Sequence, residues 1–182
     1  GISSNNITQD DLILVSRDIG AHGATIFTAR EGINMHSNLK SDCNSLYPQV
    51  KALIDAGVKI TALRDATRGG VSAVLNEWAK QSNICIEVEE ENIPVSDEVK
   101  GICEMLGFEA TNLANEGTFV LAIKKEDVAK AIEILHKFSE ASNACIIGKV
   151  TQQYPQKVIL NSSWGTKRFL DTPSGELLPR IC

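Results

Sequence analysis

Short apolar runs alternate along this chain with longer segments in which apolar residues recur at helical spacing. The runs are expected strands and cover residues 10–16, 58–63, 84–88, 119–123, 144–150, 157–160 and 167–170. The helical segments cover residues 24–30, 47–56, 71–80, 97–107 and 127–138. This order predicts an α/β or α+β fold in which α-helices flank a mixed β-sheet. With 182 residues, of which 43% are hydrophobic, the chain is long enough to bury one compact core.

The charge balance is acidic, with 23 Asp and Glu residues against 18 Lys and Arg residues and a formal net charge of -5. Nucleic-acid binding needs a basic surface, so this class of partner is disfavoured. No apolar run approaches the roughly 18 residues that a membrane span needs. The first residues also lack the pattern of a secretory signal. We therefore expect a cytoplasmic chain that binds neither membrane nor nucleic acid.

The five cysteines contain no C-x-x-C pair, and their odd number argues against a complete disulfide framework. Cys85, Cys103 and Cys145 lie within apolar segments, where a thiol behaves as a small hydrophobic group. We expect these three in the core. Cys43 lies near the start of a predicted helix, and a helix N-terminus favours the thiolate of an exposed cysteine. The sequence leaves the reactivity of Cys43 open.

A polar loop joins the predicted strand 58–63 to the predicted helix 71–80. Its residues that matter for binding are Asp65, Thr67, Arg68, Gly69 and Gly70. Two glycines allow close approach of a ligand to the backbone, a helix N-terminus presents free N–H groups, and Arg68 adds a positive charge. These features favour a bound phosphate. The equal alternative is a polar turn in which Asp65 and Arg68 pair with each other.

Two further positions offer acid–base groups. Asn115, Glu116 and Gly117 precede the predicted strand 119–123, where a carboxylate can accept a proton from a substrate. The alternative is a solvated turn. His22 lies between Gly20 and Gly23, in an expected flexible loop, where an imidazole can contact phosphate or act as an acid or base. The alternative for His22 is an ordinary surface position.

The other candidate side chains have weaker signals. His36 lies in a polar stretch and His136 lies on an expected exposed face of helix 127–138, and neither has partners at the spacing of metal ligands. We therefore predict no metal site. Cys182 ends an irregular tail of Pro, Gly and polar residues, so its thiol is expected to move between sites. The alternative is a frayed end that happens to finish in cysteine.

Four stretches together resemble the HypE family of hydrogenase maturation factors. They are residues 65–70 (Asp-Ala-Thr-Arg-Gly-Gly), 113–117 (Leu-Ala-Asn-Glu-Gly), 170–171 (Leu-Asp) and 178–182 (Leu-Pro-Arg-Ile-Cys). The tail residues Pro179, Arg180, Ile181 and Cys182 are the most specific element. The loop 65–70 is less specific, because it also resembles the wider superfamily of aminoimidazole ribonucleotide (AIR) synthetase, selenophosphate synthetase and thiamine-monophosphate kinase.

The resemblance implies a particular domain organisation. Residues 11–170 would form an AIR-synthase-related C-terminal domain, residues 1–10 a linker remnant, and residues 171–182 a mobile tail that ends in the reactive cysteine. In this superfamily a separate N-terminal domain carries most ligands of ATP and Mg²⁺ and the homodimer interface. The contacts to nucleotide phosphate implied within this chain are Asp65, Thr67, Arg68, Gly69, Gly70 and His22.

The resemblance also implies a reaction. In the HypE family the C-terminal cysteine accepts a carbamoyl group from the carbamoyltransferase HypF, and ATP-dependent dehydration turns it into a thiocyanate. The cyanide is delivered to iron on the HypC–HypD complex during nickel–iron hydrogenase maturation. By resemblance Cys182 is the carrier thiol, Glu116 the base that takes the N–H proton, and Asn115 the residue that orients the carboxamide. The chain has Ala21 and Thr118 where the family usually has Asp and often Lys.

Two other functions stay open at this point. One is another ATP-dependent enzyme of the AIR synthase and selenophosphate synthetase type, which the Pro-Arg-Ile-Cys ending disfavours. The other is a non-catalytic docking module for HypF or HypC–HypD, because the expected ATP ligands of the other domain are not in this chain.

Overall fold

A computed structural model of the chain describes residues 1–32 and 39–173. Its strands form one mixed sheet in the order β2-β4-β1-β5-β3-β6-β7, in which β3 and β6 are parallel and the other paired neighbours antiparallel. The strands are β1 (Leu12–Val15), β2 (Ile60–Asp65), β3 (Cys85–Glu89), β4 (Phe119–Ile123), β5 (Cys145–Thr151), β6 (Val158–Asn161) and β7 (Lys167–Phe169). The mixed sheet predicted from the sequence is confirmed.

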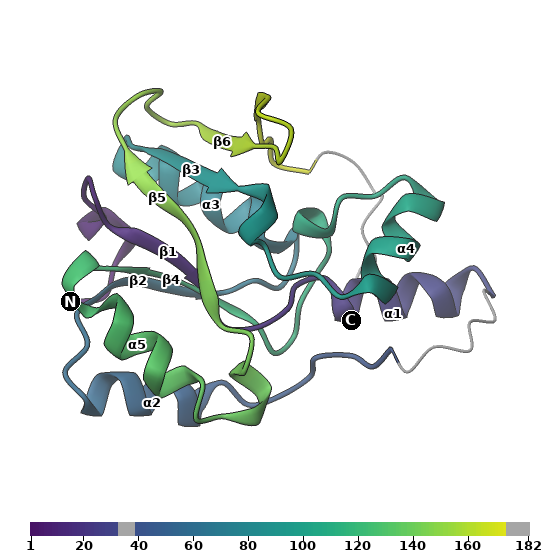
Figure 1. Cartoon of the computed structure of the whole chain (residues 1–182), viewed down its shortest axis with the longest axis horizontal. Coiled ribbons are helices and arrows are strands. Elements are labelled where there is room, and N and C mark those ends of the chain that lie inside the picture. Colours follow the sequence, from purple (N-terminus) through teal and green to yellow (C-terminus); the bar gives the residue numbers. More distant parts are fainter. Residues whose placement is uncertain (33–38, 174–182) are drawn as a thin grey trace.

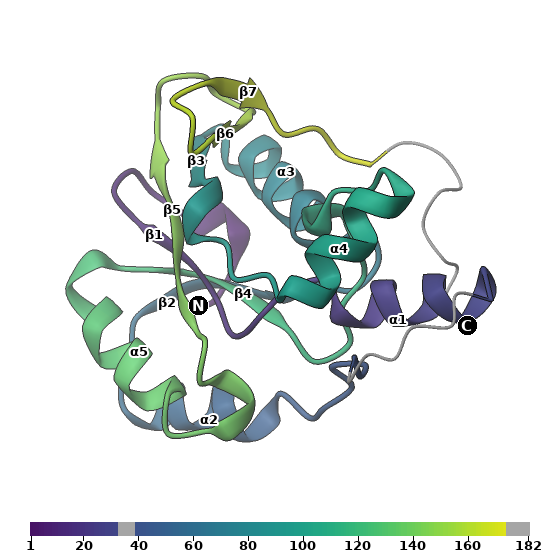
Figure 2. The ribbon, with the colours of Figure 1, turned by 45° about the vertical axis from the view of Figure 1, so that its right-hand side comes forward.

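Helices cover both faces and one end of this sheet. They are α1 (Ala21–Arg30), α2 (Tyr47–Asp55), α3 (Gly70–Ser82), α4 (Asp97–Leu106) and α5 (Val128–Leu135). Short 3-10 turns are η1 (Ser4–Asn6), η2 (Glu90–Asn92), η3 (Ala110–Asn112), η4 (Lys125–Asp127) and η5 (Ser139–Ala141). In Figure 1, α2 and α5 lie together below the sheet, while α1 and α4 lie at its right-hand end. Figure 2 shows α3 on the side of the sheet away from α2 and α5.

The two faces of the sheet bury different helices because neighbouring residues of a strand point to opposite sides. On β1, Ile13 and Val15 join the cluster that contains Leu75 and Trp78 of α3. Leu14, between them, joins the cluster that contains α2 and α5 residues. A third cluster joins α1 to α4 outside the sheet. The sheet is therefore covered on both faces, and α1 with α4 extends its end.

The helix ends follow local chemistry. Ser96 caps α4 by accepting the N–H of Val99 at 3.3 Å, and Gly107, with φ of 72°, ends it. The helix expected over 127–138 is shorter, since α5 ends at Leu135 and the chain then turns. The helix expected to start at residue 24 begins earlier, at Ala21, because Gly20 adopts φ of 88° and starts it. The expectation that His22 lies in a flexible loop is therefore wrong.

The first ten residues, expected as a linker, pack against the domain. Ile7 is buried in the main core, and the N–H of Ser3 donates to the carbonyl of Thr61 at 2.9 Å. At the other end, Leu170 is buried, and its carbonyl accepts the Asn76 side-chain amide of α3 at 2.8 Å. The expected mobile tail, from residue 174 on, lies outside the described residues.

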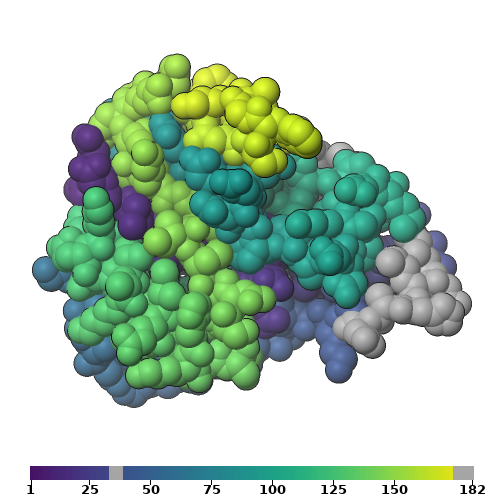
Figure 3. All heavy atoms as spheres, viewed as in Figure 1, coloured from purple at the N-terminus to yellow at the C-terminus, as the bar shows by residue number. Residues whose placement is uncertain are grey.

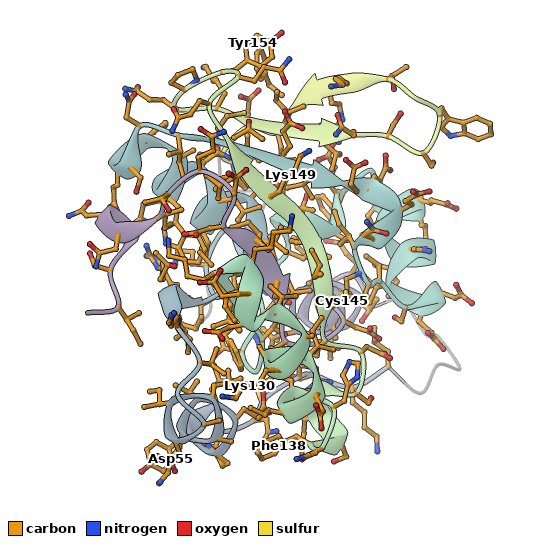
Figure 4. All side chains as sticks on the ribbon, turned by 60° about the vertical axis from the view of Figure 1, so that its left-hand side comes forward. Asp55, Lys130, Phe138, Cys145, Lys149 and Tyr154 are labelled. Atoms are coloured by element: carbon orange, nitrogen blue, oxygen red, sulfur yellow. The ribbon has the colours of Figure 1, made fainter. Side chains whose placement is uncertain are left out.

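One edge of the sheet is formed by β7, which lies next to β6. In Figure 3 the yellow atoms of the segment with β6 and β7 lie at the top of the molecule. Figure 4 shows Cys145 and Lys149 in succession along β5, with Tyr154 in the turn beyond, and Asp55 and Phe138 where α2 and α5 pack.

Among the helices of residues 1–32 and 39–173, none combines the length and apolar composition that crossing a bilayer requires.

Candidate functional site

The register of three strands brings the candidate residues to one end of the sheet. Val15 at the end of β1 pairs with Val120 of β4, and Asp65 at the end of β2 pairs with Phe119. The loops that leave β1 and β2 therefore meet the segment 113–118 that enters β4. The sequence could not predict this meeting, since the segments are far apart along the chain.

Asn115 joins these three loops. Its Oδ1 accepts the N–H of Gly20 at 2.8 Å, and its Nδ2 donates to the carbonyls of Ala66 at 2.8 Å and Leu113 at 3.1 Å. Asn115 is 1% exposed, so these bonds are shielded from water. Both N–H bonds of its amide are used within the protein. Asn115 thus fixes the backbone of the site, which differs from the expected direct contact with a substrate amide.

Asp42 is a site residue that the sequence analysis did not predict. It is 2% exposed, and its carboxylate accepts the N–H groups of Glu116 and Gly117, both at 3.0 Å, and the hydroxyl of Thr118 at 2.7 Å. These three bonds hold the segment 113–118 against the chain that leads into α2. The sequence carries no mark of its burial, since Asp42 lies in a polar stretch between Ser41 and Cys43.

Gly117 permits this close approach. A Cβ atom at Gly117 would lie 1.7 Å from the carbonyl oxygen of Asp42, a distance that no real side chain occupies. The glycine was expected to allow a turn, and the contact with Asp42 gives a stronger reason. The two backbones touch, so the position of Glu116 is set by both segments.

Beside Glu116 lies a cluster of polar side chains from α1 and the segment before α2. His22 is 7% exposed, its Nδ1 lies 2.7 Å from Ser41 Oγ, and its Nε2 lies 3.9 Å from Glu116 Oε1. Cys43 Sγ lies 3.1 Å from Ser41 Oγ and 3.9 Å from His22 Nδ1. The structure therefore brings His22 and Glu116 together and adds Ser41 and Cys43 to them. The side chain of Glu116 is 30% exposed, so it is accessible from outside as well as from His22.

The loop between β2 and α3 is shaped by its glycines. Gly69 and Gly70 have φ of 79° and 64°, and a Cβ at Gly70 would lie 2.5 Å from the carbonyl oxygens of Thr111 and Leu113. Only glycine tolerates both the conformation and the contact. The first turn of α3 also contains Ser72, whose buried Oγ has no hydrogen-bond partner among the described residues.

The charged side chains of the same loop are turned outward. Asp65 and Arg68 are exposed and Thr67 is half-buried. Across residues 1–32 and 39–173 no ion pair joins Asp65 to Arg68, so the paired-turn alternative is not what the structure shows. Arg64, one residue before Asp65, pairs with Glu77 of α3 instead. An exposed guanidinium next to a glycine-led helix start fits a phosphate group.

The remaining candidates lie apart from this site or outside the described residues. Cys85 and Cys103 are buried as expected, and Cys145 is half-buried with its thiol 3.4 Å from the carbonyl of Asn92. Burial raises the pKa of the Cys103 thiol, and burial together with the charge of Asp18 raises that of Cys145. His136 is exposed and bonds the carbonyl of Ala144 through Nε2 at 2.8 Å. The candidates outside the described residues are His36, Pro179, Arg180, Ile181 and Cys182.

No group of three or more His, Cys, Asp and Glu side chains in the described part of the chain is arranged to hold a metal ion. The groups that the site does offer are a carboxylate, an imidazole, a thiol and a glycine-led helix start. These suit proton transfer and phosphate binding.

Similar proteins share this domain. The carbamoyl dehydratase HypE of Escherichia coli K12 is 43% identical over 180 residues, which are 98% of this chain and 52% of that protein. A putative hydrogenase expression/formation protein of Methanocaldococcus jannaschii is 41% identical over 97% of this chain and 52% of its own length. The chain therefore spans about half the length of the curated relatives it matches.

Solved structures agree with this likeness. A crystal structure of the hydrogenase maturation protein HypE in complex with ATP superposes with a TM-score of 0.93 at 33% identity, covering 100% of this chain and 55% of that one. A HypE chain in a HypE–HypF complex gives 0.90 at 36% identity, covering 95% and 56%. The sequence profile of the family described as AIR synthase related protein, C-terminal domain, matches residues 8–161. The chain belongs to this family of AIR synthase related C-terminal domains.

Proposed function

We propose that this chain is the C-terminal half of a HypE-type carbamoyl dehydratase. The observation that carries the proposal is the likeness to HypE proteins over 97–98% of the chain, combined with the carboxylate of Glu116, whose backbone is anchored by Asp42 at one end of the sheet. The enzyme would dehydrate a carbamoyl group on a cysteine thiol to a thiocyanate, for delivery of cyanide to iron in nickel–iron hydrogenase maturation.

Glu116 acts as the base in this proposal. Its backbone N–H is fixed by Asp42, its neighbour Asn115 is locked to two other loops, and its carboxylate is 30% exposed. A carboxylate on a fixed backbone takes the N–H proton of a carbamoyl group with little cost of reorganisation. His22 Nε2 lies 3.9 Å from Glu116 Oε1 and restricts the movement of this carboxylate toward the protein interior.

Asn115 is a positioning residue in this proposal. Its amide is engaged with Gly20, Ala66 and Leu113, so it acts on the substrate only through the backbone that carries Glu116. This revises the role that the resemblance suggested for it.

Arg68, Gly69 and Gly70 would contact nucleotide phosphate, with Asp65 and Thr67 shaping the loop. The fit rests on the exposed guanidinium of Arg68 and on the two glycines at the start of α3, where the buried Ser72 hydroxyl has no hydrogen-bond partner within residues 1–32 and 39–173. ATP supplies the phosphoryl group that makes the amide oxygen a good leaving group. A solved HypE in complex with ATP supports the nucleotide part of the proposal.

The remaining parts of the proposal concern the carrier and its partners. Cys182 would carry the carbamoyl group on the tail Pro179–Cys182, as the sequence resemblance implies. HypF would supply that group, which a HypE–HypF complex among the similar structures supports. Delivery to HypC–HypD, a homodimer formed by the other half, Mg²⁺ with the nucleotide, and a cytoplasmic location belong to the same proposal.

Mass spectrometry of the full-length protein with HypF, carbamoyl phosphate and ATP tests the proposal. In the wild type, Cys182 should gain a carbamoyl group and then lose one water. Glu116→Gln should still be carbamoylated but dehydrate about 10²-fold to 10⁴-fold more slowly, the range expected for loss of a general base. Glu133→Gln, at an exposed position of α5, is the matched control and should behave as the wild type. Dehydration of Glu116→Gln at the wild-type rate would remove Glu116 from the mechanism, and carbamoyl mass on another cysteine would remove Cys182.

A further inference from the structure

Cys43 differs from the other cysteines that the structure describes. Cys85 and Cys103 are buried and Cys145 is half-buried, whereas Cys43 is exposed. Nothing in the proposed dehydration uses this thiol. Its position is nevertheless fixed, because its neighbour Asp42 is anchored by three hydrogen bonds and its own N–H donates to Ser41 Oγ at 3.3 Å.

The Cys43 thiol is connected to a buried imidazole. Ser41 Oγ lies between them, 3.1 Å from Cys43 Sγ and 2.7 Å from His22 Nδ1. The sulfur is also within 3.9 Å of Nδ1 itself. The Ser41 hydroxyl donates to Cys43 Sγ, so a proton can leave the thiol for His22 Nδ1 directly.

The tautomer of His22 follows from its neighbours. Nε2 is buried, has no hydrogen-bond partner among the described residues and faces Glu116 Oε1 at 3.9 Å. With one proton on Nε2, toward the carboxylate, Nδ1 carries a lone pair that can take the proton of the Cys43 thiol. His22 is thus oriented as a base for the thiol, with Glu116 on its far side.

We propose that Cys43 is a thiol-modification site that takes low-molecular-weight disulfides, such as oxidised glutathione, with His22 as the base. The Cys43 thiolate attacks one sulfur of the disulfide RS–SR, a Cys43–S–SR bond forms, the RS–SR bond breaks and RS⁻ leaves. His22 Nδ1 receives the thiol proton. The disulfide is the oxidant, so Cys43 is oxidised, one RS group is reduced to the thiolate, and no further electron acceptor is consumed.

The modification would act on the neighbouring carboxylate. The added group sits on a residue next to Asp42, whose carbonyl already touches Gly117, and beside the imidazole that faces Glu116. A group of the size of glutathione, attached next to Asp42 and His22, would displace the segment that carries Glu116. This consequence rests on the proposed function and predicts reversible loss of dehydration when Cys43 is modified.

The chemical step is tested without turnover. Full-length Cys182→Ser protein is incubated with oxidised glutathione, and the modification of each cysteine is followed over time by peptide mass spectrometry. Cys43 should react before Cys103 and Cys145. His22→Gln, which keeps a polar side chain but removes the base, should slow modification of Cys43 by about tenfold or more. The control His136→Gln, at an exposed histidine outside the cluster, should leave the rate unchanged.

Folding is checked within the same experiment, because Cys103 becomes reactive if a variant unfolds. Ser41→Ala is the second variant, since it removes the hydroxyl that bonds both the sulfur and the N–H of Cys43 and keeps His22; it too should slow the reaction. Modification of Cys43 no faster than of Cys103, or equal rates in folded His22→Gln and its parent, would overturn the proposal.

The consequence is measured separately in protein that retains Cys182. Glutathione-treated protein should dehydrate its carbamoyl group more slowly and recover after reduction, while Cys43→Ser protein should turn over equally with and without treatment. Modified Cys43 with unchanged dehydration would refute the consequence and leave the modification site standing. Untreated wild type without dehydration would instead count against the proposed function.

Discussion

Replacing Asp42 by Asn should loosen the site in a measurable way. The carboxylate accepts three hydrogen bonds, one at Oδ1 from Glu116 N–H and two at Oδ2 from Gly117 N–H and the Thr118 hydroxyl. Asparagine offers one oxygen, so either orientation of its amide turns an NH₂ group toward a backbone N–H. The Thr118 hydroxyl can rotate to accept, whereas an N–H cannot. At least one bond to a charged acceptor is therefore lost, which costs about 1.5–3 kcal/mol.

Urea unfolding of the chain followed by fluorescence of the buried Trp78 measures this cost. The free energy of unfolding of Asp42→Asn should fall by about 2–3 kcal/mol, in line with one lost charged hydrogen bond and one unsatisfied N–H. The matched control Asp55→Asn removes an exposed charge that pairs with Lys51 within α2, and it should change stability by less than about 1 kcal/mol. A loss for Asp42→Asn no larger than that for Asp55→Asn would show that the three bonds do not hold the site.

Three further predictions concern other positions. Gly117→Ala places a Cβ atom 1.7 Å from a backbone oxygen, so it should cost more than about 2 kcal/mol of unfolding free energy. Gly70→Ala combines a φ of 64° with contacts of 2.5 Å to two carbonyl oxygens and should cost about 2–4 kcal/mol. Burial, with the charge of Asp18, raises the pKa of the Cys145 thiol above the ordinary 9.0, so the unfolded chain releases its proton at lower pH than the folded chain. The free energy of unfolding should therefore fall as pH rises above about 9, and that of Cys145→Ala should fall less steeply over the same range.

Gly101→Ala, in α4, is the control for both glycine variants, since a Cβ there meets no atom within 4 Å. It should leave stability unchanged or raise it by up to about 1 kcal/mol. If Gly117→Ala or Gly70→Ala were as stable as Gly101→Ala, the close contacts described for Gly117 and Gly70 would be contradicted. Equal alkaline slopes for the wild type and Cys145→Ala would show that Cys145 does not contribute to the pH dependence; the buried Cys103 contributes a remaining slope in both.

The predictable part of the fold is the part that local patterns determine. Trp78 and Leu75 recur at helical spacing, and both pack against the sheet from α3. The helix expected over residues 97–107 begins at Asp97, where the structure shows Ser96 as its N-cap. Such features depend on residues within one or two turns of each other, so a single sequence contains them in full.

The unpredicted part of the site depends on distant pairs. Asp42 bonds Gly117 across 75 residues, and Asn115 bonds Gly20 across 95. No local pattern distinguishes a buried aspartate that binds backbone N–H groups from a surface one. His22 was assigned to a loop because glycines on both sides resemble a turn, while Gly20 at positive φ starts a helix instead. Family resemblance pointed to these stretches but not to the bonds between them.

The segment around Glu116 shows how these distant bonds serve one side chain. Asn115 is 1% exposed and Thr118 is 0% exposed, while the Glu116 side chain between them is 30% exposed. Asn115 uses its polar atoms in hydrogen bonds to the backbone, and Thr118 uses its hydroxyl in a hydrogen bond to Asp42. The flanking peptide groups are therefore fixed, and the Glu116 carboxylate is left to contact a ligand. A base fixed in this way loses little conformational freedom when it engages a substrate, which favours proton transfer more than an added contact would. In the proposed mechanism, Asp42 and Asn115 act only through the backbone that carries Glu116, and they determine how well Glu116 is placed.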